Sequence, residues 1–285
     1  MNILLRAVIW ISTIVSVLSL ISFAMYIRPA RFTTNLTPAD IGLAYENVRF
    51  TAQDGVRLAG WFVPAKTQSD RIIILCHGYP ADKNNILGST YFLAGKFNLF
   101  YFDFRYLGES EGAFSSVGYH ERKDLAAAIQ WVSDRGFSKI GIYGFSLGGA
   151  VAIMVQPQGV SAIVSDSAFA SIDRLLPDIY SIFPWFTKYP FVWMTKLYTR
   201  LFLGIRTKDI TPSDTIGNLN IPILLIHSKQ DSQIPFEHAL QLYEASDKNK
   251  TILWTIEGAD HGLANFQNRS VYEKRVTDFF DQHIK

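Results

Sequence analysis

A serine stands where a predicted strand gives way to a predicted helix, and this arrangement limits the possible folds more than any other feature of the chain. The apolar run 139–143 predicts a buried strand, and the small apolar run 149–155 predicts a helix. Between them lies Gly144-Phe145-Ser146-Leu147-Gly148. Glycines on both sides of Ser146 allow a turn sharp enough to expose its Oγ at the end of the strand. The pattern fixes only three positions, Gly144, Ser146 and Gly148, and would occur by chance in about one chain of this length in ten. The rest of the sequence therefore has to support this interpretation.

An aspartate and a histidine follow the serine, each just after a predicted strand. Asp231 comes after the apolar run 221–227, and His261 comes after the run 251–256. A serine hydroxyl becomes a good nucleophile only when an imidazole accepts its proton, and a carboxylate is needed to orient that imidazole. The residues stand in the chain order serine, acid, histidine, each on a loop after a strand. We therefore predict that Ser146, Asp231 and His261 form a catalytic triad.

Other acids and histidines remain as alternatives. Asp166 also follows a predicted strand, 160–165, and is the alternative acid. Glu257 and Asp260 adjoin His261 in the chain, but a sequence neighbour cannot readily turn its side chain back to the imidazole, so we expect both to be solvated. His77 follows the predicted strand 71–76, and we expect it, like His227, to be buried and hydrogen-bonded for structural reasons.

Acyl transfer also needs N–H donors directed at the developing oxyanion. The loop His77-Gly78-Tyr79-Pro80 follows the strand 71–76 and could supply one donor. Proline has no N–H, so the predicted donor in this loop is Tyr79. The predicted second donor is the amide of Leu147, which follows the nucleophile at a helix N-terminus, where backbone N–H groups lack partners within the helix.

Predicted strands and helices alternate over most of the chain. Asp54-Gly55 between the apolar-rich runs 47–52 and 56–63 predicts a β-hairpin. Further strands are predicted at 71–76, 98–103, 139–143, 160–165, 221–227 and 250–256, and helical spacing of apolar residues predicts a helix at about 118–135. Near-continuous apolar strands are typical of a parallel sheet covered on both faces. We therefore expect an α/β fold over residues 47–285. Asp103 and Arg105, after the strand 98–103, are expected to form an ion pair that shapes a loop.

One segment is longer than the alternation requires. About 55 residues separate the strands at 160–165 and 221–227, which predicts a cap or lid at about 168–212. Its middle, 179–203, is rich in aromatic residues with interspersed lysine and arginine, which is typical of membrane-interface segments but also of an ordinary cap over the sheet. Either interpretation places an apolar wall beside the serine. We predict that Phe186, Phe191 and Trp193 line the substrate pocket.

The N-terminus has the composition of a membrane segment. The 21 residues from Ala7 to Ile27 carry no charge, which is long enough for a helix to cross a hydrocarbon core of about 30 Å. We predict a single-pass anchor at 1–28 and a linker at 29–46, with the catalytic domain outside the cytoplasm. The alternative is a cleaved signal peptide, because Ser22-Phe23-Ala24 resembles a small-x-small cleavage site, although the apolar run exceeds the usual length of about 7–15 residues.

Composition excludes some classes of function. The net charge is +2 with no basic cluster, so nucleic acid is not an expected partner. The single cysteine, Cys76, lies in a predicted buried strand and rules out an intrachain disulfide. No metal or organic cofactor is implied. The expected partners are a small-molecule or lipid acyl substrate and, through the N-terminal helix, a membrane; nothing in the sequence predicts an oligomeric state.

Together these motifs resemble the α/β-hydrolase-fold serine hydrolases, from about Asn47 to the C-terminus. The resemblance is strongest to a membrane-anchored branch with prolyl-oligopeptidase-like, monoacylglycerol-lipase-like and depalmitoylase-like enzymes. It is carried by five segments: 77–80, 101–110 (Tyr-Phe-Asp-Phe-Arg-Tyr-Leu-Gly-Glu-Ser), 144–148, 231–235 (Asp-Ser-Gln-Ile-Pro) and 258–261 (Gly-Ala-Asp-His).

This resemblance, with the predicted triad, implies a membrane-anchored serine hydrolase of the carboxylesterase, lipase or thioesterase type, which cleaves esters or thioesters through an acyl-enzyme. Two alternatives remain. One is a serine peptidase or amidase on the same fold. The other is a non-catalytic, membrane-tethered binding module that uses the aromatic segment.

Overall fold

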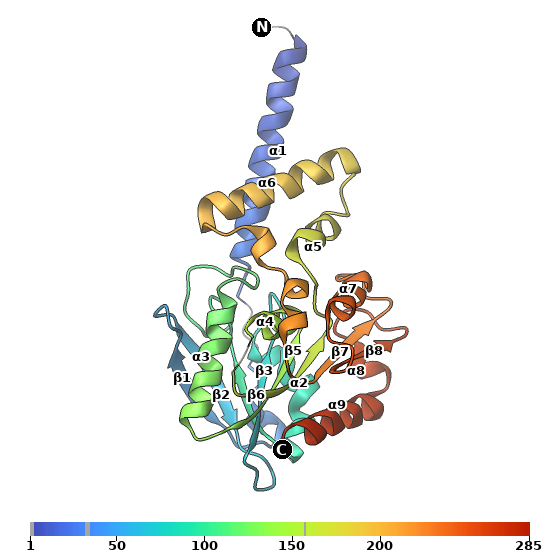
Figure 1. Cartoon of the computed structure of the whole chain (residues 1–285). Helices are drawn as coiled ribbons and strands as arrows, with labels where there is room; N and C mark the ends of the chain where they lie inside the picture. The colour runs from blue at the N-terminus through green and yellow to red at the C-terminus, as the bar shows by residue number, and fades with distance from the viewer. Residues whose placement is uncertain (1–2, 32–34, 157) are drawn as a thin grey trace.

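The computed structural model describes residues 3–31, 35–156 and 158–285, in which one eight-stranded sheet forms the centre of the domain (Figure 1). The strand order is β1-β2-β4-β3-β5-β6-β7-β8. The strands are β1 (Glu46–Thr51), β2 (Arg57–Val63), β3 (Arg71–Cys76), β4 (Asn98–Phe102), β5 (Lys139–Phe145), β6 (Val160–Asp166), β7 (Ile223–Ser228) and β8 (Thr251–Ile256). β1 and β2 form the predicted antiparallel hairpin, β2 also runs antiparallel to β4, and the remaining neighbours are parallel.

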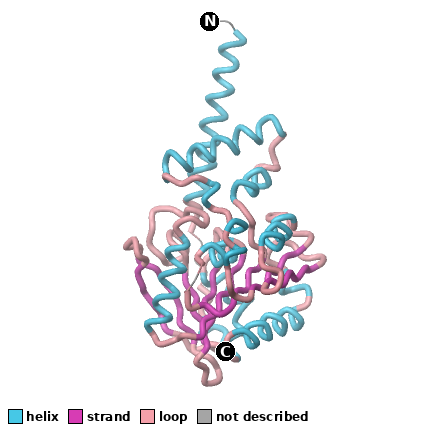
Figure 2. The backbone as a smooth tube through the Cα atoms, in the orientation of Figure 1, coloured by secondary structure: helices cyan, strands magenta, loops and turns pink. Residues whose placement is uncertain are grey.

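Helices cover both faces of this sheet, as the ribbon and the backbone tube show (Figures 1 and 2). The helices of the domain are α2 (Lys83–Thr90), α3 (Glu121–Asp134), α4 (Leu147–Met154), α7 (Glu237–Ala245), α8 (Ala264–Gln267) and α9 (Arg269–His283), with short 3-10 helices η1 (Pro38–Ile41) and η2 (Tyr91–Gly95). Successive strand side chains point to opposite faces. Ile72 and Ile74 of β3 therefore join a core with α3 and α4, whereas Ile73 and Leu75 join a second core with α2 and α9. The predicted α/β class with a mostly parallel sheet is confirmed.

The segment between β6 and β7 forms a cap beyond the carboxyl ends of the strands. It contains α5 (Ile172–Ile179), α6 (Trp185–Leu203) and three short 3-10 helices, η3 (Thr207–Asp209), η4 (Pro212–Asp214) and η5 (Ile216–Asn218). α6 lies well above the sheet and crosses the N-terminal helix α1 (Ile3–Ile27) (Figure 1). The aromatic residues of the cap are divided: Tyr180, Phe191 and Tyr198 are buried, and many of the others face outward.

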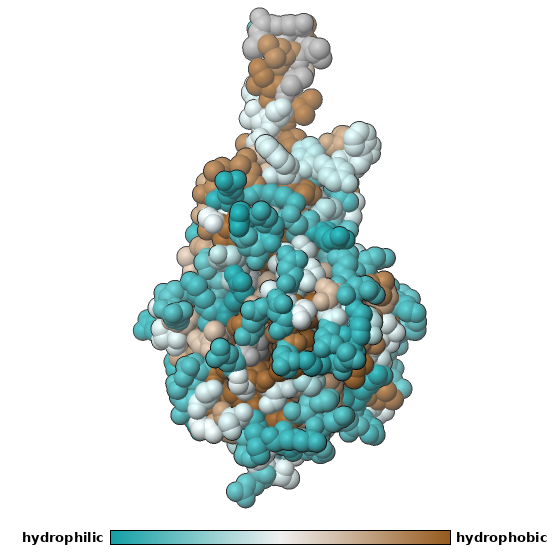
Figure 3. All heavy atoms as spheres, viewed as in Figure 1, coloured by the Kyte–Doolittle hydropathy of each residue, from teal (hydrophilic) through white to brown (hydrophobic). Residues whose placement is uncertain are grey.

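α1 has the length and composition of a membrane span. Leu5–Ile27 has a mean hydropathy of 2.2 over its most apolar window. The N-terminal half of α1 projects away from the domain, and its C-terminal half packs against α6 (Figure 1). Hydrophobic atoms gather on α1 and at its junction with the cap, whereas the surface farther from α1 is mainly hydrophilic (Figure 3).

The described part of the predicted linker packs against the domain. Residues 1–2 of the predicted anchor and 32–34 of the predicted linker lie outside the described residues. Directly after α1, Arg28 Nε donates to the Ala113 carbonyl at 2.9 Å, and Arg31 Nε donates to the Tyr106 carbonyl at 2.5 Å. Farther along, Leu43 is buried in the core that covers one face of the sheet. The domain is therefore held against the end of α1, because polar groups on both sides of the junction pair with each other.

Candidate active site

Ser146 lies in the tight turn between β5 and α4. Its backbone has φ +53° and ψ −114°, a region that a residue with a side chain rarely adopts. The two glycines allow the turn to close: a Cβ on Gly148 would collide with the Cys76 carbonyl, and one on Gly144 would collide with Gly148 itself. The Ser146 N–H donates to the Asp166 carbonyl at 2.7 Å, which ties the turn to the end of β6. A strained, well-supported backbone of this kind is typical of functional sites.

The structure brings the three residues of the predicted triad together. His261 Nε2 lies 3.1 Å from Ser146 Oγ, and His261 Nδ1 lies 2.7 Å from Asp231 Oδ2. The other carboxylate oxygen, Asp231 Oδ1, accepts the backbone N–H groups of Gln233 and Ile234 at 3.0 and 2.8 Å. The Asp231 side chain is fully buried and that of His261 is 8% exposed, so solvent competes little for these bonds. Because both Asp231 oxygens accept hydrogen bonds, the imidazole carries its proton on Nδ1 and presents a free Nε2 lone pair to the serine.

The alternative acid, Asp166, has other partners. Its carboxyl group accepts hydrogen bonds from the hydroxyl groups of Tyr143, Tyr272 and Ser167, at 3.2, 2.5 and 2.9 Å respectively. Burial raises the pKa of Asp166 above its usual value. Within the part of the chain that the structure describes, Asp166 makes no hydrogen bond to His261. Its contacts are those of a buried group that holds β5, β6 and α9 together.

Asp260, next to His261, is solvated as expected but has a structural contact as well. Its Oδ1 accepts the Ser232 N–H at 2.9 Å and the His261 N–H at 2.7 Å. These bonds tie the loop that carries His261 to the loop that carries Asp231. The carboxylate of Asp260 therefore supports the geometry of the site through the backbone and does not contact the imidazole ring.

Two backbone N–H groups are free where an oxyanion would form. Leu147 is the first residue of α4, so its N–H has no acceptor within the helix. Among the described residues, neither the Leu147 N–H nor the Tyr79 N–H donates to another protein group. Gly78 packs closely beside Ser146, since a Cβ there would lie 2.8 Å from Phe145 and 3.3 Å from the Ser146 Cβ. The loop that carries Tyr79 is thus positioned directly beside the serine.

His77 and His227 are buried, as expected, and both hold loops of the site. His77 Nδ1 donates to the Gly78 carbonyl at 2.7 Å, and its Nε2 accepts the Phe104 N–H at 3.0 Å. Burial lowers the pKa of His77, which is consistent with a neutral ring that is donor at one nitrogen and acceptor at the other. His227 Nε2 lies 2.8 Å from the Ile234 carbonyl, in the loop whose N–H groups bind Asp231.

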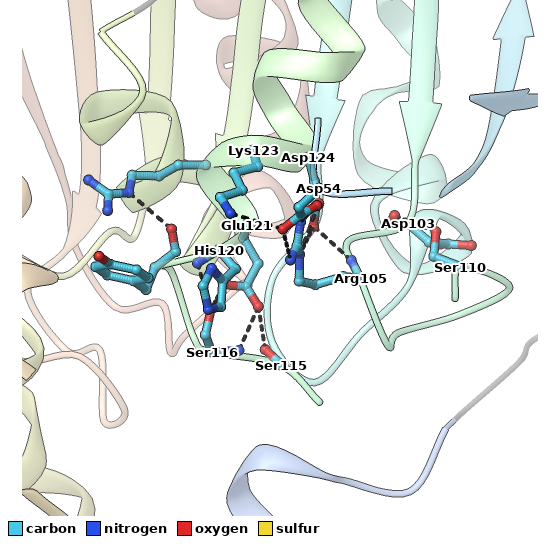
Figure 4. A network of polar contacts seen from close by, with 12 residues as sticks. Asp54, Asp103, Arg105, Ser110, Ser115, Ser116, His120, Glu121, Lys123 and Asp124 are labelled. Atoms are coloured by element: carbon cyan, nitrogen blue, oxygen red, sulfur yellow. Dashed lines mark hydrogen bonds and ion pairs between the residues drawn. The ribbon is translucent and has the colours of Figure 1, made fainter. Parts of the chain in front are cut away.

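Asp103 and Arg105 do not pair with each other, which corrects the prediction made for them. Asp103 Oδ2 binds Lys83 Nζ at 2.7 Å, and both side chains are almost fully buried. Arg105 points the other way and binds Asp54 at 2.9 Å and Asp124 at 2.6 Å (Figure 4). Both residues lie after the end of β4 at Phe102, so the alternation of a strand no longer fixes their directions. Each side chain can therefore turn toward a different element. Sequence spacing could not reveal these long-range partners.

Glu121, at the start of α3, holds a loop that borders the site. Its two carboxylate oxygens accept hydrogen bonds from Ser115 Oγ, Ser116 Oγ and the N–H groups of Ser116 and Gly118, at 2.6 to 2.8 Å (Figure 4). The side chain is completely buried. Four charge-assisted bonds to one short loop fix its position. Ser116 and Val117 of this loop line the cavity next to the serine.

A cavity of about 520 Å³ opens above Ser146 and His261, between the sheet and the cap. Its described lining is mostly apolar and comes from α1, the 115–118 loop, α5, α6 and the 232–234 loop. Named in chain order, the apolar lining residues are Phe23, Tyr26, Ile27, Tyr79, Val117, Leu147, Phe169, Ile172, Leu175, Leu176, Ile179, Tyr180, Leu203, Ile210 and Ile234. Asp178 and His261 are the only carboxylate and imidazole groups among the lining residues.

The prediction that Phe186, Phe191 and Trp193 line this pocket is wrong. Phe186 and Trp193 are 61% and 66% exposed, on the outer face of α6. Phe191 is buried, but its ring stacks on Phe183 at a centroid distance of 4.9 Å and it is not part of the cavity wall. α6 instead presents Thr195, Thr199 and Leu203 to the cavity, which share one face because they are spaced by four residues. Only the packing of α6 on α1 and α5 decides which face is turned inward.

The contribution of α1 to the pocket was also missed. Phe23, Tyr26 and Ile27 come from the predicted anchor, yet they line the same cavity as the serine. A helix that is apolar all round has no polar face to reveal which side is buried. The one available signal was the spacing of small residues at Ser16, Ser19 and Ser22, which allows another helix to approach closely.

The chain is similar in sequence and fold to known hydrolases. The prolyl oligopeptidase family matches residues 110–285. The alpha/beta hydrolase domain-containing protein WAV2 of Arabidopsis thaliana is 31% identical over 219 residues, which cover 73% of this chain and 68% of WAV2. The membrane protein YNL320W of Saccharomyces cerevisiae is 25% identical over 228 residues, covering 76% of this chain and 73% of that protein. The crystal structure of the esterase Pf2001 of Pyrococcus furiosus superposes with a TM-score of 0.75 at 26% identity, covering 90% of this chain and 100% of the esterase.

These similarities confirm the resemblance to α/β-hydrolases that the motifs suggested. The family match alone spans more than half of the chain and includes Ser146, Asp231 and His261. The chain therefore belongs to the prolyl oligopeptidase family and is a hydrolase of the α/β-hydrolase fold.

Proposed function

We propose that this protein is a serine hydrolase that cleaves carboxylic esters or thioesters of long acyl chains at a membrane surface. The observation that carries the proposal is the unbroken set of hydrogen bonds from Asp231 through His261 to Ser146, at the floor of an apolar cavity. A structural serine would not need a buried acid and imidazole aligned behind it.

The geometry supports an acyl-enzyme mechanism. Ser146 Oγ attacks the acyl carbon as its proton passes to His261 Nε2, and the buried Asp231 carboxylate stabilises the resulting imidazolium. The N–H groups of Tyr79 and Leu147 bind the oxyanion of the tetrahedral intermediate. His261 then gives the proton to the leaving alkoxide or thiolate, which departs and leaves the acyl group on Ser146. A water molecule, deprotonated by the same imidazole, attacks the acyl-enzyme, and the acid is released with Ser146 Oγ taking back its proton.

The cavity favours an apolar acyl group. Its wall offers many aliphatic and aromatic side chains and few charged groups, so a peptide backbone would leave polar groups without partners there. Each buried methylene contributes about 0.8 kcal/mol, so a chain that fills the cavity is bound far more tightly than acetate. A pocket with these properties is expected to select long acyl chains over short ones.

Amide bonds are the second candidate substrate, and the family match is the reason to keep it. The prolyl oligopeptidase family takes its name from peptide cleavage, and the same triad can form an acyl-enzyme from an amide. The difference lies in the leaving group, because an amine has to be protonated by His261 before it can depart. Parallel measurement of amide and ester substrates distinguishes the two.

We propose further that α1 spans a membrane once, with the hydrolase domain outside the cytoplasm. Support for the span comes from its length and hydropathy. An uncleaved N-terminal span with Arg6 and the amino terminus before it commonly leaves its short N-terminal flank in the cytoplasm. Added protease should digest the domain in intact cells if the domain lies outside the cytoplasm. Digestion only after lysis would place the domain on the cytoplasmic side.

The function is tested with a fluorophosphonate probe and a panel of substrates. The full chain in detergent should be labelled, Ser146→Ala should not, and Ser133→Ala, which removes an exposed hydroxyl on α3, should be labelled like wild type. Rates are then measured for p-nitrophenyl esters from C2 to C12, acyl thioesters and aminoacyl amides. Absence of labelling in a folded wild-type protein would reject the serine hydrolase. Labelling with a preference for amides would favour the peptidase or amidase instead.

A further inference from the structure

The C-terminal half of α1 packs into the cap along one face. Tyr198 of α6 donates its hydroxyl to the Ser16 carbonyl at 3.0 Å, and the ring of Phe23 lies 5.8 Å from that of Tyr198. Ser19 and Phe23 are 0% and 4% exposed, although the helix around them is largely exposed. The spacing of these residues by three and four positions defines a single buried stripe on α1. A simple tether would need no such contact.

The last turns of α1 reach the loop that carries the proposed oxyanion donor. The ring of Tyr26 stacks on that of Tyr79 at 5.7 Å with an interplanar angle of 20°, and the Tyr79 hydroxyl donates to the Tyr26 carbonyl. One residue later, the Ile27 carbonyl accepts the N–H of Ser115, in the loop that Glu121 fixes. Phe23, Tyr26 and Ile27 thus form a wall of the cavity that holds Ser146.

The length of α1 determines how deep in a membrane the cavity would lie. The part of α1 before Ser16 is about 20 Å long at 1.5 Å per residue, which is too short to cross a hydrocarbon core of about 30 Å. If α1 spans a bilayer, part of α6 and the top of the cap must therefore lie within the membrane. The outer face of α6 suits this position, because Trp185, Tyr189 and Trp193 are 75%, 59% and 66% exposed. The cavity between α1, α5 and α6 then opens at the edge of the lipid chains, because about 30 Å of helix counted from Ile3 ends close to Phe23.

We propose that α1 is a substrate-binding element: its Phe23, Tyr26 and Ile27 side chains contact the acyl chain, which reaches Ser146 along α1 from the surrounding lipid leaflet. The substrate class is therefore an acyl lipid that remains partly in the bilayer while its ester or thioester carbonyl reaches the serine. The inference rests on the proposed serine hydrolase and adds that the membrane helix determines chain-length preference.

The test compares two faces of α1 in the full-length protein. Phe23→Ala and Tyr26→Ala remove side chains from the cavity wall. Ile21→Ala and Met25→Ala are matched controls at the same depth, because these side chains are 51% and 67% exposed on the other face. Tyr26→Phe keeps the ring, so its preference for laurate over butyrate should be closer to that of wild type than the preference of Tyr26→Ala. Each protein is purified in detergent, labelled with the fluorophosphonate probe, and assayed with p-nitrophenyl butyrate and laurate below their critical micelle concentrations.

The expected readout is the laurate-to-butyrate ratio of kcat/KM. Loss of contact with two methylenes should lower this ratio about tenfold in Phe23→Ala and Tyr26→Ala, whereas Ile21→Ala and Met25→Ala should keep the wild-type ratio. Equal ratios in the wall and control variants would overturn the role of α1 and leave the serine hydrolase intact. Failure of the wild type itself to label or to hydrolyse either ester would reject the proposed function instead. If a wall variant also loses labelling, the laurate-to-butyrate ratio is measured in Ile27→Ala instead, because this change shortens a side chain of the same wall without removing a ring.

Discussion

Replacing Asp231 by asparagine should disable the hydrolase through the histidine and leave the fold intact. Asp231 Oδ1 accepts two backbone N–H groups, so the carbonyl oxygen of an asparagine has to remain on that side. The amide NH₂ then faces His261 Nδ1, which lies 2.7 Å from Oδ2 in the wild type. Two donors cannot share this contact, so the imidazole moves its proton to Nε2. In that tautomer, Nε2 can no longer accept the proton of Ser146.

The size of the loss follows from two terms. The carboxylate and the imidazolium charge centres are about 4 Å apart, which gives about 4 kcal/mol of attraction at an effective dielectric constant of about 20. Since about 1.4 kcal/mol corresponds to a tenfold change in rate, this term alone is worth about 10³. The wrong tautomer adds to it. We therefore expect kcat to fall by about 10³ to 10⁴, with KM little changed because Asp231 lies outside the substrate cavity.

The assay is steady-state hydrolysis of p-nitrophenyl octanoate together with the rate of fluorophosphonate labelling. Asp166→Asn is the matched control: it makes the same chemical change at a buried aspartate after a neighbouring strand, but its partners are hydroxyl groups that can rotate to suit an amide. Thermal unfolding of both variants shows whether the fold is retained. A crippled Asp166→Asn beside a nearly normal Asp231→Asn would refute the assignment of the acid.

Three further predictions concern the apolar helix α1, the buried ion pairs and the dependence on pH. The protein should stay with membranes in carbonate and high salt, because the proposed span places α1 and the outer face of α6 in contact with lipid; release by carbonate, or a mature N-terminus near Met25 on protein sequencing, would contradict an uncleaved span. Arg105→Ala should destabilise the domain by about 3–5 kcal/mol in urea unfolding, because it leaves the buried Asp124 carboxylate without its partner, whereas Arg57→Ala, which breaks an exposed pair with Glu111, should unfold like wild type. The stability should fall as pH drops below about 6.5, because burial lowers the folded-state pKa of His77 and the unfolded chain then binds more protons. Urea midpoints at pH 7.5 and 5.5 should differ less in His77→Gln, and an unchanged difference would show that other groups cause the effect.

The local elements of this fold could be predicted because the residues within each short segment determine its secondary structure. The apolar runs became β3 to β8 within a few residues of the predicted bounds, and Asp54-Gly55 made the expected hairpin. The turn that carries the nucleophile could also be predicted, because Gly144 and Gly148 stand where a Cβ would collide with the neighbouring backbone. The order of Ser146, Asp231 and His261 predicted three loops at one edge of a parallel sheet, where the structure places them within hydrogen-bonding distance.

The ion-pair partners of charged side chains could not be predicted from the local sequence. Asp103 and Arg105 are two residues apart and of opposite charge, yet they bind Lys83 and Asp124, which lie about 20 residues away in the chain. An ion pair in a protein core forms where the fold brings desolvated charges together, and not where the sequence places them side by side.

The sequence by itself determined that this chain carries an apolar helix, a hydrolase domain and an aromatic cap, because hydropathy and glycine placement act locally. Only the tertiary structure decided how these parts share one pocket. α1 is apolar on every side and α6 is aromatic on both sides, so neither pattern shows which face turns inward. That choice came from the packing of the two helices on each other, which buried Phe23 and Thr199 beside the serine and left Phe186 and Trp193 outside.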